Sequence, residues 1–80
     1  MNAIKNFLDK VPQKDAEHIS FVITLLLNKK FSGLNITKIV GTEFYRVRVE
    51  KYRIIYFFDS SQEVQIIAIR NRDEGTYKNL

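Results

Sequence analysis

The sequence predicts an α+β domain in which two N-terminal helices pack on a three-stranded antiparallel β-meander. Up to Leu27, apolar residues recur with the spacing of three or four that is typical of amphipathic helices. From Phe44 onward, Val, Ile, Tyr and Phe predominate with a period of two, as in strands. A chain of 80 residues has room for one small core, so we expect a single domain over residues 1–80.

Two helices are expected before residue 30. The first has helically spaced apolar residues at Ile4, Phe7, Leu8 and Val11, and Pro12 interrupts it. The second is expected to start near Lys14 or Asp15, with a core stripe of Ile19, Val22, Ile23 and Leu26. Lys29 and Lys30 near its end suit the negative pole of the helix dipole. Residues 32–42, punctuated by Gly33 and Gly41, read as a connecting segment.

Three strands are expected over residues 44–49, 52–58 and 63–70, because short polar gaps between them favour hairpins. A turn at Glu50 and Lys51 sets Arg48 opposite Arg53. A symmetric four-residue turn would give the same pairs, and it is favoured by the fact that Glu-Lys is not a preferred pair for a two-residue turn. Closing the second hairpin about Ser60 and Ser61 sets Arg53 opposite Ala68, and Ile54 opposite Ile67.

This register predicts two different sheet faces. The face expected to pack on the helices carries Tyr45, Val47, Val49, Tyr52, Ile54, Tyr56, Ile67 and Ile69. The other face carries Arg46, Arg48, Arg53 and Arg70, together with the apolar Ile55, Phe57, Val64 and Ile66. Arg72 joins this second face if the alternation continues beyond residue 70.

Two interpretations of the arginines stay open. Directly opposed like charges destabilise a sheet by some tenths of a kcal/mol, so a phosphate group between Arg48 and Arg53 would account for the pair. Alternatively, the face is solvated and its charges are matched by Glu43, Glu50 or Asp73. The apolar end of this face is covered either by the chain itself or by an amphipathic partner helix or strand.

Composition excludes several function classes. The chain has a net charge of +4, no Cys and a single His, so thiolate zinc sites, Cys nucleophiles and a Ser-His-Asp triad are not expected. No metal-ligand spacing or glycine-rich phosphate loop occurs, and no cofactor is expected. No signal segment or membrane-length apolar run is present, which predicts a cytoplasmic protein without membrane contact. His18 is expected at the surface.

Tyr77 follows the last predicted strand. Two roles are open for it: packing down a loose terminus, or stacking on a nucleobase and taking part in proton transfer. Nearby arginines would lower the pKa of its phenol, because positive charge favours the phenolate.

The stretch FYRVRVEKYRIIY at residues 44–56 resembles the signature hairpin of the RelE/ParE toxin superfamily. The segment IAIRNR at residues 67–72, followed by Tyr77, is similar to the last strand of that family, its following arginine and its C-terminal tyrosine. The junction KVPQKD at residues 10–15 is similar to the junction between the family's two helices. The resemblance spans roughly residues 4–78.

The resemblance implies a toxin of a type II toxin–antitoxin system: a RelE-type mRNA interferase that cuts mRNA on the ribosome without a metal ion. Attack by a 2′-hydroxyl on the adjacent phosphate would leave a 2′,3′-cyclic phosphate. The implied catalytic residues are Arg48, Arg53, Arg72 and Tyr77, and the implied RNA-binding residues are Arg46 and Arg70. The partners it implies are mRNA on the ribosome and a cognate antitoxin that binds through an amphipathic segment.

The sequence departs from the family at two places. The family's usual strand before the first helix has no counterpart in residues 1–3, so we expect a three-stranded sheet with an exposed edge. The spacing from Arg72 to Tyr77 is about one residue shorter than in the best-known members. Two alternative functions therefore remain: a ParE-like toxin that binds a protein target such as DNA gyrase, and a catalytically inactive RNA-binding remnant.

Overall fold

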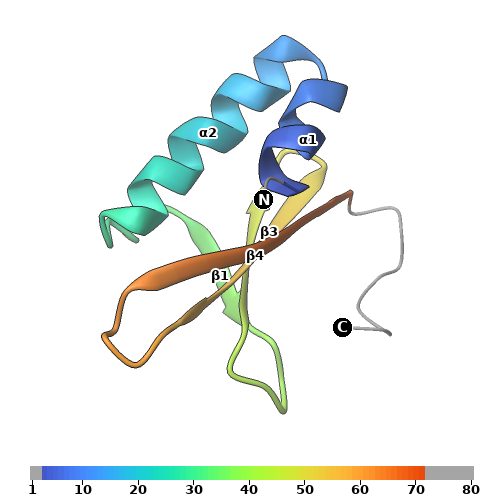
Figure 1. The fold of residues 1–80 in the computed structure, drawn as a ribbon. Helices are drawn as coiled ribbons and strands as arrows, with labels where there is room; N and C mark the ends of the chain where they lie inside the picture. The colour runs from blue at the N-terminus through green and yellow to red at the C-terminus, as the bar shows by residue number, and fades with distance from the viewer. Residues whose placement is uncertain (1–2, 72–80) are drawn as a thin grey trace.

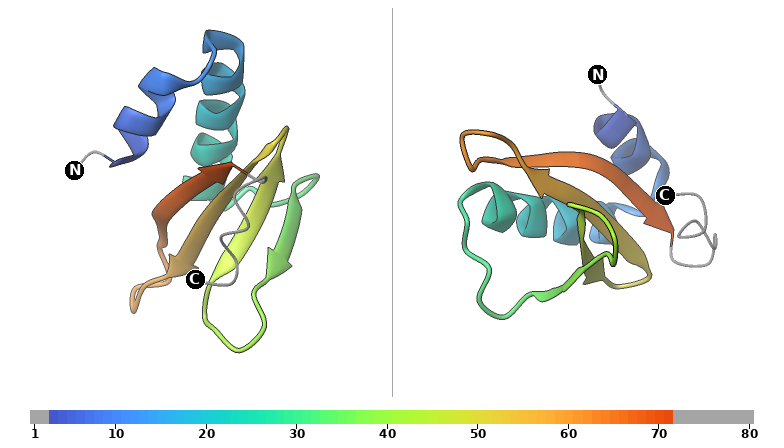
Figure 2. Two further views of the ribbon diagram at one scale, coloured as in Figure 1. Left: turned by 90° about the vertical axis from the view of Figure 1, so that its right-hand side faces the viewer. Right: turned by 90° about the horizontal axis from the view of Figure 1, so that it is seen from below.

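A computed structural model describes residues 3–71 of the chain. Two helices, α1 (Ala3–Lys10) and α2 (Gln13–Leu27), are followed by four strands, β1 (Asn35–Lys38), β2 (Tyr45–Val49), β3 (Tyr52–Phe58) and β4 (Val64–Asn71) (Figure 1). The strands form one antiparallel sheet in the order β1-β2-β3-β4. Both helices lie on the same side of this sheet (Figure 2). The predicted α+β class is confirmed.

The helices begin and end close to the predicted positions. Pro12 separates α1 from α2, because a proline ring is tolerated at a helix start but not in its interior. Asp15 lies in the first turn of α2, where a carboxylate is favoured by the helix dipole. Helix α2 ends at Leu27, so Lys29 and Lys30 follow its last turn closely, near the helix end as predicted. Lys29 contacts Glu63 in the β3–β4 turn, with Nζ and Oε2 3.2 Å apart.

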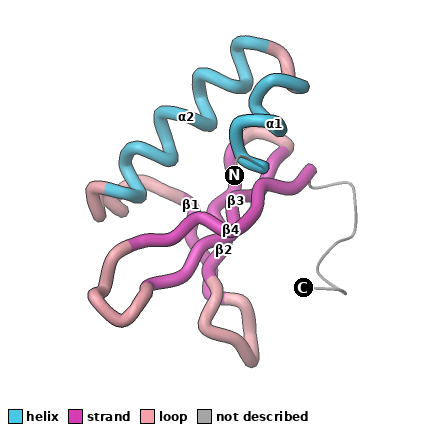
Figure 3. Tube along the Cα trace, viewed as in Figure 1, coloured by secondary structure: helices cyan, strands magenta, loops and turns pink. Residues whose placement is uncertain are grey.

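The prediction of a three-stranded sheet was wrong, because the segment expected to be only a connection contains β1 (Figure 3). This strand pairs with β2, so that Asn35 lies opposite Arg48 and Lys38 opposite Tyr45. Only Ile36 of β1 is partly buried against the core, and the strand has four residues. One inward apolar side chain is too short a pattern to predict a strand. The fourth strand therefore comes from the segment between α2 and β2.

The β2–β3 hairpin has the predicted register. Val49 lies opposite Tyr52 and Arg48 opposite Arg53, so the turn consists of Glu50 and Lys51 alone. The expectation of a wider turn was wrong. Glu50 has a φ of 55°, the left-handed conformation that tight hairpin turns require and that side-chain-bearing residues adopt at a cost.

The register of the β3–β4 hairpin differs from the predicted one. Arg53 lies opposite Arg70 and Ile54 opposite Ile69, and the pairing then shifts by one residue between Ile55 and Tyr56. The shift is a β-bulge, in which two residues of one strand oppose one of the other. It leaves Ile67 without a partner and 42% exposed, instead of buried opposite Ile54 as predicted.

The bulge also moves the start of β4 to the other face. Val64 lies opposite Phe58 and Ile66 opposite Tyr56, and both pack with the core under the helices. The prediction that Val64 and Ile66 share a face with the arginines was therefore wrong. Side chains alternate between the two faces along a strand. One extra residue at the bulge therefore places the β4 residues before it on the opposite face from the one predicted.

The core lies between the helices and the sheet face that they cover, which we call the helix face. Its buried residues are Ile19, Val22, Leu26, Val47, Val49, Tyr52, Ile54, Tyr56, Val64 and Ile69. The opposite sheet face is called the arginine face. No helix or strand of residues 3–71 covers the arginine face (Figure 2).

Candidate functional site: a row of arginines across the sheet

Three arginines lie side by side on the arginine face. Arg48 on β2 is directly opposite Arg53 on β3, and Arg53 is directly opposite Arg70 on β4. Adjacent strands are about 4.8 Å apart, so the three Cα atoms span about 10 Å. We call Arg48, Arg53 and Arg70 the arginine row. The prediction that these residues share one face is confirmed.

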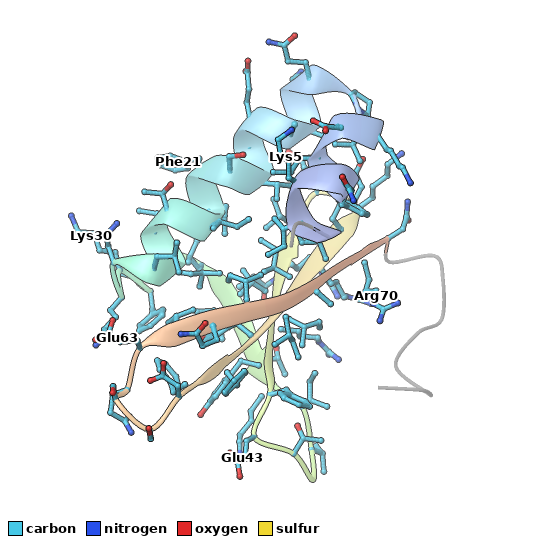
Figure 4. The ribbon with its side chains drawn as sticks, in the orientation of Figure 1. Lys5, Phe21, Lys30, Glu43, Glu63 and Arg70 are labelled. Carbon is cyan, nitrogen blue, oxygen red and sulfur yellow. The ribbon has the colours of Figure 1, made fainter. Side chains whose placement is uncertain are left out.

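The row has a half-buried centre and exposed ends. Arg48 and Arg70 are exposed, whereas Arg53 is half-buried and its Nε atom has no solvent contact. Figure 4 shows Arg70 near the end of β4, with Glu63 and Lys30 near the beginning of that strand. Arg53 therefore lies between two exposed cations, one on each neighbouring strand.

The four strands that present this surface carry no carboxylate. Their sequences contain Lys38, Arg46, Arg48, Arg53 and Arg70 but no Asp or Glu. Directly opposed like charges destabilise a sheet. An anion on the row would reverse that repulsion, because guanidinium groups bind phosphate oxygens through paired, charge-assisted hydrogen bonds.

Contacts on the helix face hold the end of the hairpin next to the row. The Tyr52 hydroxyl donates a hydrogen bond to Asp15 Oδ2 of α2 at 2.7 Å, and the Phe7 ring packs edge-on against Tyr52. His18 Nδ1 lies 2.9 Å from Glu50 Oε2. His18 is exposed, as predicted. Tyr52 is adjacent to Arg53 in the chain, so these contacts fix the backbone that carries the row.

The Tyr52–Asp15 hydrogen bond predicts a loss of stability at high pH. It raises the pKa of Tyr52 to about 12, and burial and the charges of Asp15 and Glu50 act in the same direction. An unfolded chain releases this proton near pH 10, so the stabilisation is complete below about pH 10 and lost as the pH approaches 12. Urea midpoints should therefore fall over this range.

The matched measurement uses Tyr52→Phe, which removes the hydroxyl and retains the ring. Below pH 10 we expect this variant to be less stable than wild type by about 1 kcal/mol, because one hydrogen bond is lost. Between pH 10 and 12 it should lose less stability than wild type does. Tyr45→Phe, which leaves Tyr52 in place, is the control and should keep the wild-type fall. An equal fall in Tyr52→Phe would contradict the assignment.

The other predicted site residues are placed only in part. Arg46 is half-buried on the arginine face. It lies on β2 two residues before Arg48 and is opposite Ile55. Arg72 and Tyr77 lie outside the described residues, and their roles stay predictions. The described tyrosines, Tyr45, Tyr52 and Tyr56, pack with the core on the helix face. Within residues 3–71, no cluster of three or more His, Cys, Asp or Glu side chains could hold a metal ion.

Sequence reasoning missed three residues of this face. Asn35 extends the row onto β1 opposite Arg48, and Thr37 lies opposite Arg46. Phe44 contacts Phe57, with ring centroids 6.1 Å apart. The signal for Asn35 and Thr37 is the alternating stretch Asn-Ile-Thr-Lys, which is at the short limit of the four to eight residues that indicate a strand.

The chain was compared with models of known protein families. The model of the ParE toxin of type II toxin-antitoxin system, parDE, matches residues 2–75. The chain belongs to this family. It is therefore a toxin of a type II toxin–antitoxin system, as the resemblance of its hairpin implied, and the family implies an antitoxin partner. No curated protein and no solved structure gives a match.

The helices of this toxin are short. α2, the longer of the two described, has 15 residues. Neither α1 nor α2 has the length and apolar content needed to cross a membrane.

Proposed function

We propose that this toxin is a ribosome-dependent endoribonuclease that cleaves mRNA at the arginine row. The observation that carries the proposal is the direct opposition of Arg48, Arg53 and Arg70 on a face whose strands contain no carboxylate. Such a surface suits a phosphodiester backbone, since fixed guanidinium groups match phosphate oxygens in charge and geometry.

The proposed reaction is a transesterification within the RNA. The 2′-oxygen of one nucleotide forms a bond to the adjacent phosphorus, and the bond from phosphorus to the 5′-oxygen of the next nucleotide breaks. The products are a 2′,3′-cyclic phosphate and a 5′-hydroxyl, so one proton leaves the 2′-hydroxyl and one is taken up by the 5′-oxygen. The row would stabilise the extra negative charge on the five-coordinate phosphorus.

Proton transfer needs a group other than the row. An arginine stays protonated in proteins, so it cannot act as the base. The described tyrosines lie on the helix face, and the Tyr52 hydroxyl is bonded to Asp15. The proton carriers we propose are therefore Tyr77 or a group of the ribosome. The ribosome would also align the 2′-hydroxyl with the phosphate, which accounts for a requirement for it.

The experiment is cell-free translation with the purified toxin, followed by primer extension to map mRNA ends. We expect new 5′ ends that require ribosomes with wild-type protein, and at least a 100-fold loss of these ends with Arg48→Ala. Lys30→Ala removes the same charge at the far side of the molecule and should cleave normally (Figure 4). Uncut mRNA with wild-type toxin, or full cleavage by folded Arg48→Ala, would overturn the proposal.

The family match favours a second candidate, a ParE-type toxin that acts on a protein target such as DNA gyrase. In that case the toxin would arrest DNA replication while translation continues, and no mRNA ends would appear. A third outcome, ribosome binding with a steep salt dependence and no cleavage, would identify a catalytically inactive RNA-binding protein.

A further inference from the structure

Two aromatic rings lie on the arginine face beyond the row. Phe57 of β3 and Phe44, just before β2, are both half-buried and contact each other at an interplanar angle of 71°. Gln65 of β4 lies opposite Phe57. The helices pack on the other face, so neither ring belongs to the main core.

The rings stand at a fixed distance from the row. Phe57 lies four positions after Arg53 along β3, which corresponds to about 13 Å at the rise of a strand. Arg46 lies midway, since it pairs with Ile55 between these two positions. Along the β2–β3 hairpin the face therefore presents a pair of cations, one further cation and a pair of rings, in that order.

This order matches the repeat of a single-stranded nucleic acid. Phosphates bind cations, and bases released from pairing stack on aromatic side chains presented by a sheet. A strand with one phosphate at the row and the next at Arg46 would bring a base to Phe57. A phenylalanine ring has no hydrogen-bonding group, so stacking on it does not distinguish one base from another. It should, however, increase the affinity for a strand that carries bases over that for an abasic strand.

We propose that Phe57, supported at its edge by Phe44, is a base-stacking position for the nucleotide about two positions from the phosphate held at the arginine row. The inference rests on the proposed function of that row and adds a positioning residue to it. Stacking there would hold the RNA along the hairpin, so that the phosphate at the row cannot slide.

The test compares two uncleavable single strands of six nucleotides, oligodeoxyadenylate and a fully abasic deoxyribose-phosphate strand of equal length. Fluorescence anisotropy at one salt concentration gives the Kd of each. Stacking of one base is worth about 5- to 140-fold in affinity, and wild-type toxin should prefer the base-bearing strand by a factor in this range. Phe57→Leu should lose most of that preference, and Phe57→Tyr should retain it.

Two control variants separate stacking from other effects. Phe21→Leu makes the same change at a 61% exposed ring on α2 and should leave both Kd values unchanged. Arg48→Ala should weaken both strands by the same factor, because it removes a phosphate contact. Circular dichroism of each variant establishes that the fold is retained.

The outcomes separate this inference from the function on which it rests. A wild-type preference retained by Phe57→Leu would overturn the stacking position, as would the absence of any preference in wild type. In both cases, if Arg48→Ala weakens the binding of the two strands by the same factor, the arginine row is still supported as a phosphate-binding site. If wild type binds neither strand, the proposed RNA surface fails as well. A Phe57→Leu protein that binds both strands normally but loses its antitoxin would assign the rings to protein docking and overturn the inference.

Discussion

Replacing Arg53 with alanine is expected to abolish growth arrest by this toxin. Arg53 is the centre of the row, with Arg48 opposite it on one side and Arg70 on the other, and its Nε atom has no solvent contact. A half-buried side chain has fewer orientations open to it than an exposed one, so the Arg53 guanidinium needs less reordering to meet charge that develops on a phosphate. Loss of one preorganised donor of this kind costs about 100- to 1,000-fold in rate.

The measurement is the rate of appearance of cleaved mRNA in cell-free translation, together with colony counts after toxin induction. Arg53→Lys is the informative companion, because it retains the positive charge but not the planar fork. We expect Arg53→Lys to bind ribosomes like wild type and to cleave at least ten times more slowly. Full activity of a folded Arg53→Ala protein would show that the centre of the row has no part in cleavage.

The second large effect is expected from Ile54→Ala, which should destabilise the protein by about 2–5 kcal/mol. Ile54 is fully buried in β3, one of the two inner strands of the sheet, opposite both Val47 and Ile69. Removal of its three outer carbons leaves a cavity that strands on both sides prevent from closing. The whole stability of a small domain is about 5–15 kcal/mol, so the variant should be partly unfolded at 37 °C.

Ile67→Ala is the matched control for that substitution. The chemical change is identical, but the β-bulge leaves Ile67 42% exposed, and the expected loss is below about 1 kcal/mol. Urea denaturation of both variants at neutral pH gives the two values. Equal losses would mean that Ile67 is buried, as an unbulged register would have it, and would contradict the bulge.

Local patterns predicted most of the secondary structure. The two helices could be predicted from the helical spacing of apolar residues before and after Pro12. The β2–β3 register could be predicted from the position of its turn, because the turn of a hairpin determines which residues of the two strands are paired. That register was sufficient to predict that Arg48 and Arg53 are directly opposed. Family membership was also implied by short motifs at residues 10–15, 44–56 and 67–72 and by their order along the chain.

The β-bulge and the first strand could not be predicted in the same way. The bulge at Ile67 lets Val64 and Ile66 pack with the core that residues of α2 also form, and this core joins segments far apart in the chain. Strand β1 forms because β2 has an unpaired edge beside it, and its own four residues carry little signal. The pairings of Tyr52 with Asp15 and of His18 with Glu50 likewise join residues 37 and 32 positions apart.

The sequence by itself therefore determined the fold class, the family and the two arginines of the central hairpin, because each depends on residues close together in the chain. Only the tertiary structure decided how wide the arginine surface is. It placed Arg70 beside Arg53, added Asn35 at the outer strand and brought Phe44 against Phe57. Those placements depend on how strands pair and which faces the helices bury, and burial is a property of the whole folded chain.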